Sequence, residues 1–244
     1  MNFNLLGRGP TQVACYNVQS LNMTHLQTHI DHLVIAAETL EQGVAYVKEQ
    51  LGVGMPFGGV HPQMGTHNHL MRLGDGIFLE VIAINPDAEP PRRPRWFGLD
   101  DALIRAQLAV QPVLLTWVVN SNDIDQLIRN AAFSAGTAEP ISRGDLHWHF
   151  GLPEDGRLLA GGTLPYAIEW HTDRHPAESM ADLGCRFEKL EIYHPRAEWL
   201  QSALESIAAQ DLVTVHPLPG NETAYMVVSV QTPAGLKSLS SKIC

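Results

Sequence analysis

Apolar positions along residues 30–84 follow the periods of a strand, a helix and a hairpin in turn. The run IDHLVIAA (30–37) is short, apolar and partly β-branched, which predicts a buried strand. Thr39 can cap a following helix, which Gly52 would end. Two further runs, 67–73 and 77–84, flank the turn sequence Gly-Asp-Gly and predict an antiparallel hairpin. With a loop through 56–62, the first unit is a strand, a helix and two or three strands.

The same order of elements begins again after a proline- and arginine-rich segment at 90–95. The run VLLTWVV predicts a strand, and Asn122 or Asp123 can cap a helix that ends at Gly136. Later strands are predicted for DLHWHFGL (145–152) and LPYAIEWH (164–171). The chain therefore contains a second βαβββ unit.

Two offsets relate the units to each other. Placing His32 over Thr116 gives an offset of 84 residues, whereas placing Glu80 over Glu169 gives 89. The second unit would then carry five extra residues, most easily in the loop 153–162, because loops accept added length at little cost. A repeat with one loop insertion follows from this comparison.

A third segment begins at the alternating strand FEKLEIY, followed by a helix opened by Pro195 and two more predicted strands. Residues 1–26 are polar without a sustained period and are interpreted as an arm without regular structure. No phosphate-binding glycine motif is present. The sequence predicts an α+β fold with this division: an arm (1–26), a first βαβββ module (27–95), a second βαβββ module (96–178) and a shorter βαββ segment packed on them (179–244).

Charge and composition narrow the class of function. The 244 residues carry a formal charge of −10, which argues against a nucleic-acid or anionic-membrane partner. The longest apolar run, near 113–119, is far short of the roughly 20 residues that span a bilayer. Three widely spaced cysteines favour a reducing compartment, and the N-terminal residues lack the pattern of a secretory signal. We expect a soluble, acidic, cytoplasmic protein.

Polar groups inside apolar strands are the candidates for chemistry. Side chains alternate along a strand, so Glu80 shares a face with apolar neighbours, where burial is costly unless it is paired or bound to a cation. His32 and Glu169 interrupt their strands in the same way. His67 and His69 are two residues apart and so share one face of their strand. Two imidazoles and a carboxylate could occupy one side of a metal and leave positions open for substrate. Edge exposure, or an ion pair with Arg72, Arg92 or Arg143, is the competing interpretation for both glutamates.

The residues resemble a known family at this point. IDHLVIAAETLEQGVAYVKEQLGV and GTHNHLMRLGDGIFLEVIAINP look like the first module of a glyoxalase-like protein of the vicinal oxygen chelate superfamily. RWFGLD, SRGDLHWHF, LPYAIEWHTDRHPA and QTPAGLKSL are similar to blocks of one bacterial branch, the Glyoxalase-like domain family. The resemblance implies paired βαβββ modules with curled mixed sheets that form a cleft for a divalent metal, with iron, nickel, zinc and manganese as candidates.

The resemblance also implies ligand positions. Glyoxalase I enzymes take metal ligands from the first and last strand of each module, and the matching positions here are His32, Glu80, Thr116 and Glu169. Thr116 stands where a histidine would complete that set. The ring-cleaving dioxygenases of the superfamily use two histidines and a glutamate, which here would be His32, His69 and Glu80. The second mapping depends on strand register, because a slip of one residue sends His69 to the other face.

Three functions are considered, and the sequence does not decide between the first two. The first is a metal-dependent lyase, isomerase or dioxygenase on a small substrate with neighbouring oxygens, in which Glu80 or Glu169 moves a proton. The second is a non-catalytic small-molecule-binding protein without a complete metal set, which Thr116 favours; a structural homodimer is a third. Pocket walls and an anion anchor are predicted from these residues: Arg95, Trp96, Trp117, Arg143, Trp148 and Trp170.

Overall fold

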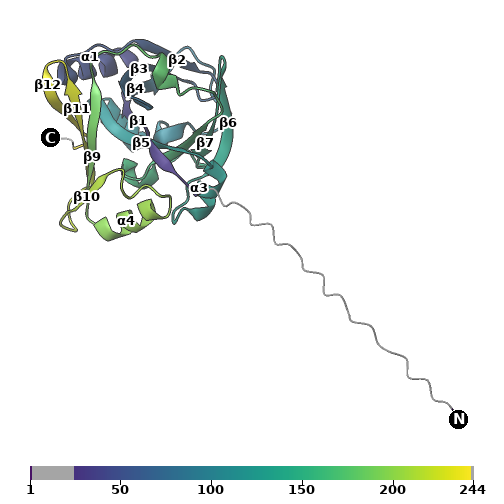
Figure 1. The fold of residues 1–244 in the computed structure, drawn as a ribbon. Coiled ribbons are helices and arrows are strands. Elements are labelled where there is room, and N and C mark those ends of the chain that lie inside the picture. Colours follow the sequence, from purple (N-terminus) through teal and green to yellow (C-terminus); the bar gives the residue numbers. More distant parts are fainter. Residues whose placement is uncertain (2–24, 243–244) are drawn as a thin grey trace.

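The computed structural model describes Met1 and residues 25–242 (Figure 1). The predicted N-terminal arm therefore lies almost wholly outside the described residues. The first module contains β1 (Thr28–Ala36), α1 (Leu40–Leu51), β2 (Phe57–His61), β3 (Thr66–Gly74) and β4 (Ile77–Ile84). The second contains β5 (Val113–Ser121), α3 (Ile124–Asn130), β6 (Thr137–Arg143), β7 (Leu146–Leu152) and β8 (Tyr166–Trp170). Short helices lie between these elements: η1 (Trp96–Gly98), α2 (Ala102–Leu108), η2 (Leu159–Gly162) and η3 (Pro176–Ser179).

The two modules share one mixed sheet of eight strands in the order β2-β3-β4-β1-β5-β8-β7-β6. In each module the first strand pairs with the last in parallel, β1 with β4 and β5 with β8. An antiparallel pairing of β1 with β5 joins the modules at the centre of the sheet. The sheet curls into a half-barrel, as Figure 1 shows. This arrangement confirms the predicted α+β fold of repeated βαβββ modules.

Two β-bulges show which residues of the two modules occupy equivalent positions. The register of the β1–β5 pairing shifts at two places, where Asp31 is the extra residue of β1 and Leu115 the extra residue of β5. The two bulges are 84 residues apart, which supports placing His32 over Thr116. Val34 pairs with Glu80, and its counterpart Val118 pairs with Tyr166. The predicted match of Glu80 to Glu169 is therefore wrong, since strand register places Tyr166 at the equivalent position.

The helix ends agree with the predicted capping residues in three of four cases. Thr39 accepts a hydrogen bond from the Gln42 amide at the start of α1, and Gly52 ends the helix with a positive φ of 76°. Asp123 caps α3 in the same way. The predicted end of α3 at Gly136 is wrong, because the helix stops at Asn130 and the Ala132 amide bonds instead to Ser206 Oγ (2.9 Å). A tertiary contact thus lies directly beyond the end of this helix.

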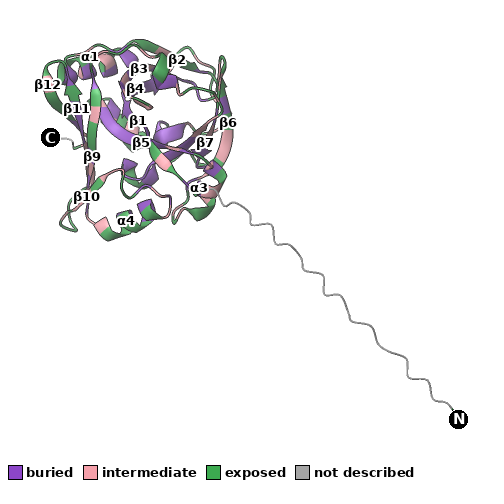
Figure 2. Ribbon diagram, viewed as in Figure 1, coloured by how far each residue is buried: buried purple, intermediate pink, exposed green. Residues whose placement is uncertain are grey.

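The C-terminal segment forms a second sheet beside the first. It contains β9 (Arg186–His194), α4 (Ala197–Glu205), β10 (Thr214–Pro217), β11 (Tyr225–Thr232) and β12 (Gly235–Ser240), in the strand order β10-β9-β11-β12. Three strands follow its helix, one more than the predicted βαββ order. Buried positions concentrate where the two sheets and their helices meet (Figure 2). In the described part of the chain, no helix is long and apolar enough to cross a membrane.

Candidate functional site

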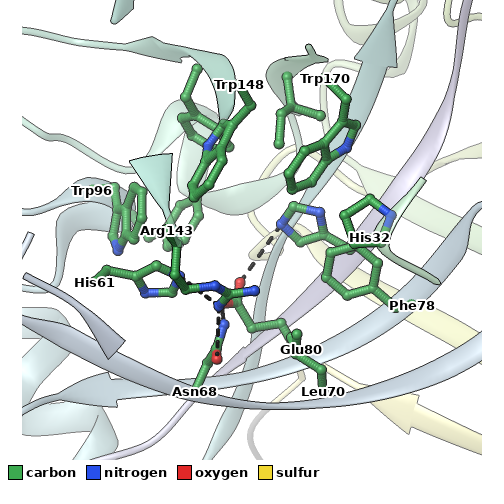
Figure 3. A pocket seen from close by; sticks show the side chains of 14 residues that line it. His32, His61, Asn68, Leu70, Phe78, Glu80, Trp96, Arg143, Trp148 and Trp170 are labelled. Carbon is green, nitrogen blue, oxygen red and sulfur yellow. Dashed lines mark hydrogen bonds and ion pairs between the residues drawn. The ribbon is translucent and has the colours of Figure 1, made fainter. Parts of the chain in front are cut away.

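The curled sheet encloses a cavity of about 450 Å³, including its open mouth, between the inner faces of the two modules (Figure 3). Five polar side chains line it, four from the first module and one from β6: His32, His61, Asn68, Glu80 and Arg143. Six aromatic side chains form most of the remaining wall: Phe78, Trp96, Phe97, Trp148, Phe150 and Trp170.

Strand register decides which side chains face this cavity. Leu70 of β3 lies opposite Glu80 of β4, so Asn68, Leu70 and Glu80 share the inner face. His69 lies opposite Val81 and takes the outer face, where its Nδ1 contacts the Met55 carbonyl oxygen (2.8 Å). The predicted trio of His32, His69 and Glu80 is therefore not brought together. The register of β3, on which that prediction depended, turned His69 away.

The bulge in β1 joins two consecutive polar side chains. An extra residue breaks the alternation of a strand, so Asp31 and His32 can contact each other although they are neighbours in sequence. His32 Nδ1 lies 2.5 Å from Asp31 Oδ1. Burial alone would raise the pKa of Asp31, but hydrogen bonds from His175 and His32 outweigh it and hold the pKa well below its usual value. The ionised carboxylate only accepts, so Nδ1 of His32 carries a proton and Nε2 is the ring nitrogen available as a base.

The second oxygen of Asp31 anchors a segment of the cavity wall. Asp31 Oδ2 accepts hydrogen bonds from Trp170 Nε1 (2.8 Å) and His175 Nε2 (2.9 Å). His175 Nδ1 accepts from the Ala177 amide, so its proton is on Nε2. His175 caps η3, and Pro176 of that helix lines the cavity. Asp31, which is wholly buried, thus fixes His32, one indole and η3 together.

Glu80 faces His32 across the cavity floor. Glu80 Oε2 lies 3.6 Å from His32 Nε2, and Glu80 Oε1 accepts a hydrogen bond of 2.6 Å from Asn68 Nδ2. Gly58 of β2 makes room for this amide, since a Cβ there would lie 2.4 Å from Asn68 Oδ1. The Phe78 ring stacks on the imidazole of His32 with a centroid distance of 4.5 Å. These contacts orient the carboxylate and the imidazole toward each other.

Arg143 brings a positive charge from the second module. Its Nη1 donates to His61 Nε2 (3.3 Å) and lies 3.4 Å from Asn68 Oδ1. His61 must then carry its proton on Nδ1, which faces Thr66 Oγ1 (3.2 Å). Burial, followed by the charge of Arg143, lowers the pKa of His61 to about 3. His61 is therefore neutral at pH 7 and serves to hold the guanidinium.

The remaining predicted site residues divide between the cavity and the rest of the fold. Trp96, Arg143, Trp148 and Trp170 line the cavity as expected, together with His32 and Glu80. Five others lie elsewhere and bond to neighbouring groups: Arg95 to Asp100, Thr116 to the Gly162 carbonyl, Trp117 to the Thr163 carbonyl, Glu169 to the Ile124 amide and His69 as described. Glu169 thus contacts the first turn of α3 from outside the cavity.

Sequence reasoning missed four residues of the site: Asp31, His61, Asn68 and His175. Asp31 stands in the apolar run IDHLVIAA next to His32, which is the signal that could have found it. Asn68 lies between His67 and His69, which were the candidates on β3 but occupy the outer face of the strand. His61 and His175 lie at a strand end and in a loop before η3, where no periodic pattern marks them.

The donor set does not fit a resident divalent metal. The described residues bring together no group of three His, Cys, Asp or Glu side chains that could hold one. His32 and Glu80 supply two donors, whereas catalytic metal sites of this kind typically use three protein ligands. His61, the other imidazole on the wall, has its Nε2 occupied by Arg143. The polar groups instead form one chain of hydrogen bonds and short contacts.

These features define a protein of the vicinal oxygen chelate type, in which paired βαβββ modules curl around one ligand cavity. The model of the family described as Glyoxalase-like domain matches residues 30–208, which include both modules. The chain belongs to this family. A comparison with curated proteins found no match.

Three solved structures are similar to this chain at low sequence identity. A hypothetical protein from Staphylococcus aureus is 11% identical, with a TM-score of 0.53 over 88% of this chain and 85% of that one. Methylmalonyl-CoA epimerase from Mycobacterium tuberculosis is 16% identical, with a TM-score of 0.36 over 58% of this chain and 86% of the epimerase. A hypothetical protein from Bacillus halodurans C-125 is 12% identical, with a TM-score of 0.38 over 60% of this chain and 96% of that one.

Proposed function

We propose that this protein is an enzyme that removes and returns a proton on a small molecule with neighbouring oxygens, held in the cavity between the modules. One observation carries the proposal: the Nε2 of His32 faces the cavity while its Nδ1–H is held by the buried carboxylate of Asp31. A base fixed in this way is the arrangement that general acid–base catalysis requires.

The roles of the polar residues follow from their contacts. His32 Nε2 accepts a proton from the substrate, and Asp31 stabilises the imidazolium that forms. Glu80 lies close enough to take the proton on or to return it at a neighbouring atom. Arg143 provides positive charge where negative charge develops on the substrate oxygens. The aromatic wall keeps water away and so strengthens each of these interactions.

The metal-dependent form of this function, a lyase or a dioxygenase, stays a separate prediction. One feature favours it, because a carboxylate that holds the far nitrogen of a histidine is also typical of metal ligands. It would need a third donor that the cavity's described side chains do not offer. The non-catalytic alternative also remains, since an enclosed cavity can retain a ligand without turnover.

Proton exchange tests the proposal without knowledge of the natural substrate. A panel of small molecules with neighbouring oxygens is incubated with the protein in D2O, and loss of C–H signals is followed by NMR. We expect exchange with at least one panel member that binds, and a loss of at least about a hundredfold in Glu80→Gln. Glu169→Gln is the matched control, because this glutamate lies outside the cavity.

Two outcomes would contradict the proposal. Molecules that bind in the cavity but show no exchange above the uncatalysed rate would favour the binding-protein alternative. Equal loss of exchange in Glu80→Gln and Glu169→Gln, with both variants folded, would place the chemistry elsewhere.

A further inference from the structure

Aromatic rings are concentrated in the cavity far beyond their frequency in the chain. Phenylalanine, tyrosine and tryptophan make up 7% of the sequence, whereas they are six of the fourteen residues that line the cavity. Three of the five tryptophans are among them, Trp96, Trp148 and Trp170. Trp148 and Trp170 contact each other with a ring-centroid distance of 5.1 Å. Such walls offer flat apolar faces to a flat ligand.

Polar groups lie across the cavity from two of these rings. In Figure 3 the indoles of Trp148 and Trp170 lie on one side of the cavity, with Asn68 and Glu80 on the other. A ligand that fills the space therefore contacts rings with one part and polar groups with another. The ligand must accordingly be amphipathic.

Arg143 retains donors for this ligand. Its hydrogen bonds within the described structure use Nη1 alone, toward His61 and Asn68. No carboxylate of the described residues lies within 4.0 Å of its guanidinium, although the charge of Glu80 acts on it. The Nε and Nη2 atoms of one guanidinium edge can bind a carboxylate through two parallel hydrogen bonds.

Trp96 supplies a second, independent indication of a ligand. Its side chain lines the cavity and is 4% exposed, yet its Nε1–H has no hydrogen-bond partner among the described residues. A buried donor without a partner is unfavourable, so an acceptor on a ligand that reached it would be stabilising.

We infer that the ligand class of this cavity is a single-ring aromatic carboxylate with a hydroxyl beside the carboxylate. The ring lies among the indoles and phenylalanines, and the carboxylate pairs with Arg143. The neighbouring hydroxyl faces His32 and Glu80, which accept its hydrogen bond; this last contact rests on the proposed function, whereas the ring and the carboxylate do not. A cationic ligand, which aromatic walls also attract, would meet the unpaired charge of Arg143.

Equilibrium dialysis with three matched probes tests the inference. The probes are 2-hydroxybenzoate, its ring-saturated analogue cis-2-hydroxycyclohexanecarboxylate and its uncharged analogue 2-hydroxybenzamide. We expect 2-hydroxybenzoate to bind at least about tenfold more tightly than either analogue, since each lacks one recognised feature. Arg143→Gln should remove the preference for the carboxylate over the amide and keep the preference for the flat ring. Arg157→Gln, at an exposed pair with Asp155, should change neither preference.

Each other outcome overturns the inference. Equal binding of the saturated analogue removes the aromatic class, and equal binding of the amide removes the anion. Preferential binding of phenyltrimethylammonium would replace the anion by a cation, and absence of binding by all three probes removes the class altogether. Because 2-hydroxybenzoate has no acidic C–H, catalysis is judged on panel members that have one. Selective binding of 2-hydroxybenzoate, with no C–H exchange on any of those panel members, would leave the ligand class standing while the proposed catalysis fails. Exchange on non-aromatic panel members, with no selectivity among the probes, would support the proposed catalysis and overturn the ligand class.

Discussion

Replacement of Asp31 by asparagine tests the contact on which the site depends. Asp31 is wholly buried and accepts hydrogen bonds from His32, Trp170 and His175. An asparagine of the same shape offers one oxygen in place of two and presents an amide group to a donor. Removing one member of such a buried charged network costs about 3–5 kcal/mol. We therefore expect Asp31→Asn to lower the free energy of unfolding by about that amount at pH 7.

The pH dependence of this effect has a definite sign. The folded-state pKa of Asp31 is lowered, so its contribution to stability is complete above its unfolded pKa and decreases as the pH falls through it. A carboxyl that titrates near 3.9 when unfolded and stays ionised when folded loses about 1.3 kcal/mol of its contribution by pH 3. The difference between wild type and Asp31→Asn should shrink by that amount.

Urea unfolding followed by circular dichroism at pH 7 and pH 3 measures both quantities. Asp173→Asn is the control, because Asp173 is exposed. A difference between wild type and Asp31→Asn that is the same at both pH values would refute the reasoning. It would show that the shape of the side chain, and not its charge, holds the network.

Three further predictions concern neighbouring residues. The low pKa of His61 predicts no titration of its ring signals by NMR between pH 5 and pH 8; a midpoint near 6.5 would contradict its burial beside Arg143. Glu169→Gln should lower stability by about 1 kcal/mol in urea unfolding, since Glu169 bonds the Ile124 amide at the start of α3; no change would refute this role. Gly58→Ala should lower stability by about 1–3 kcal/mol and reduce proton exchange, because its Cβ displaces Asn68 from Glu80; an unaltered exchange rate would count against that coupling.

The repeat and its helix starts could be predicted from the sequence because each depends on local pattern. Thr39 and Asp123 precede periodic apolar residues. The strands of the two modules follow one another in the same order. The end of α3 could not be predicted in this way, since no local capping residue marks it and the Ala132 amide beyond it bonds to distant Ser206. Local pattern therefore located the elements better than their boundaries.

The site was predictable only in part, because a bulge and a register determine it. His32 and Glu80 stand out as polar residues inside apolar strands, and both line the cavity. The side on which His69 lies depends on the pairing of β3 with β4, which the sequence of β3 alone does not determine. The contact of Asp31 with His32 needs the bulge in β1. The match of Glu169 to Glu80 failed for the same reason, since strand pairing and not residue identity relates the two modules.

In the proposed function the protein's own side chains, led by His32, move the proton. The most direct measurement is the NMR rate of C–H exchange in D2O for one bound panel molecule, with chelator-treated wild type and His32→Gln compared at saturation. We predict that the chelator-treated wild type keeps its rate and that His32→Gln loses at least about a hundredfold. A wild type that loses exchange with the chelator and regains it with one divalent metal per chain, by elemental analysis, would contradict the claim.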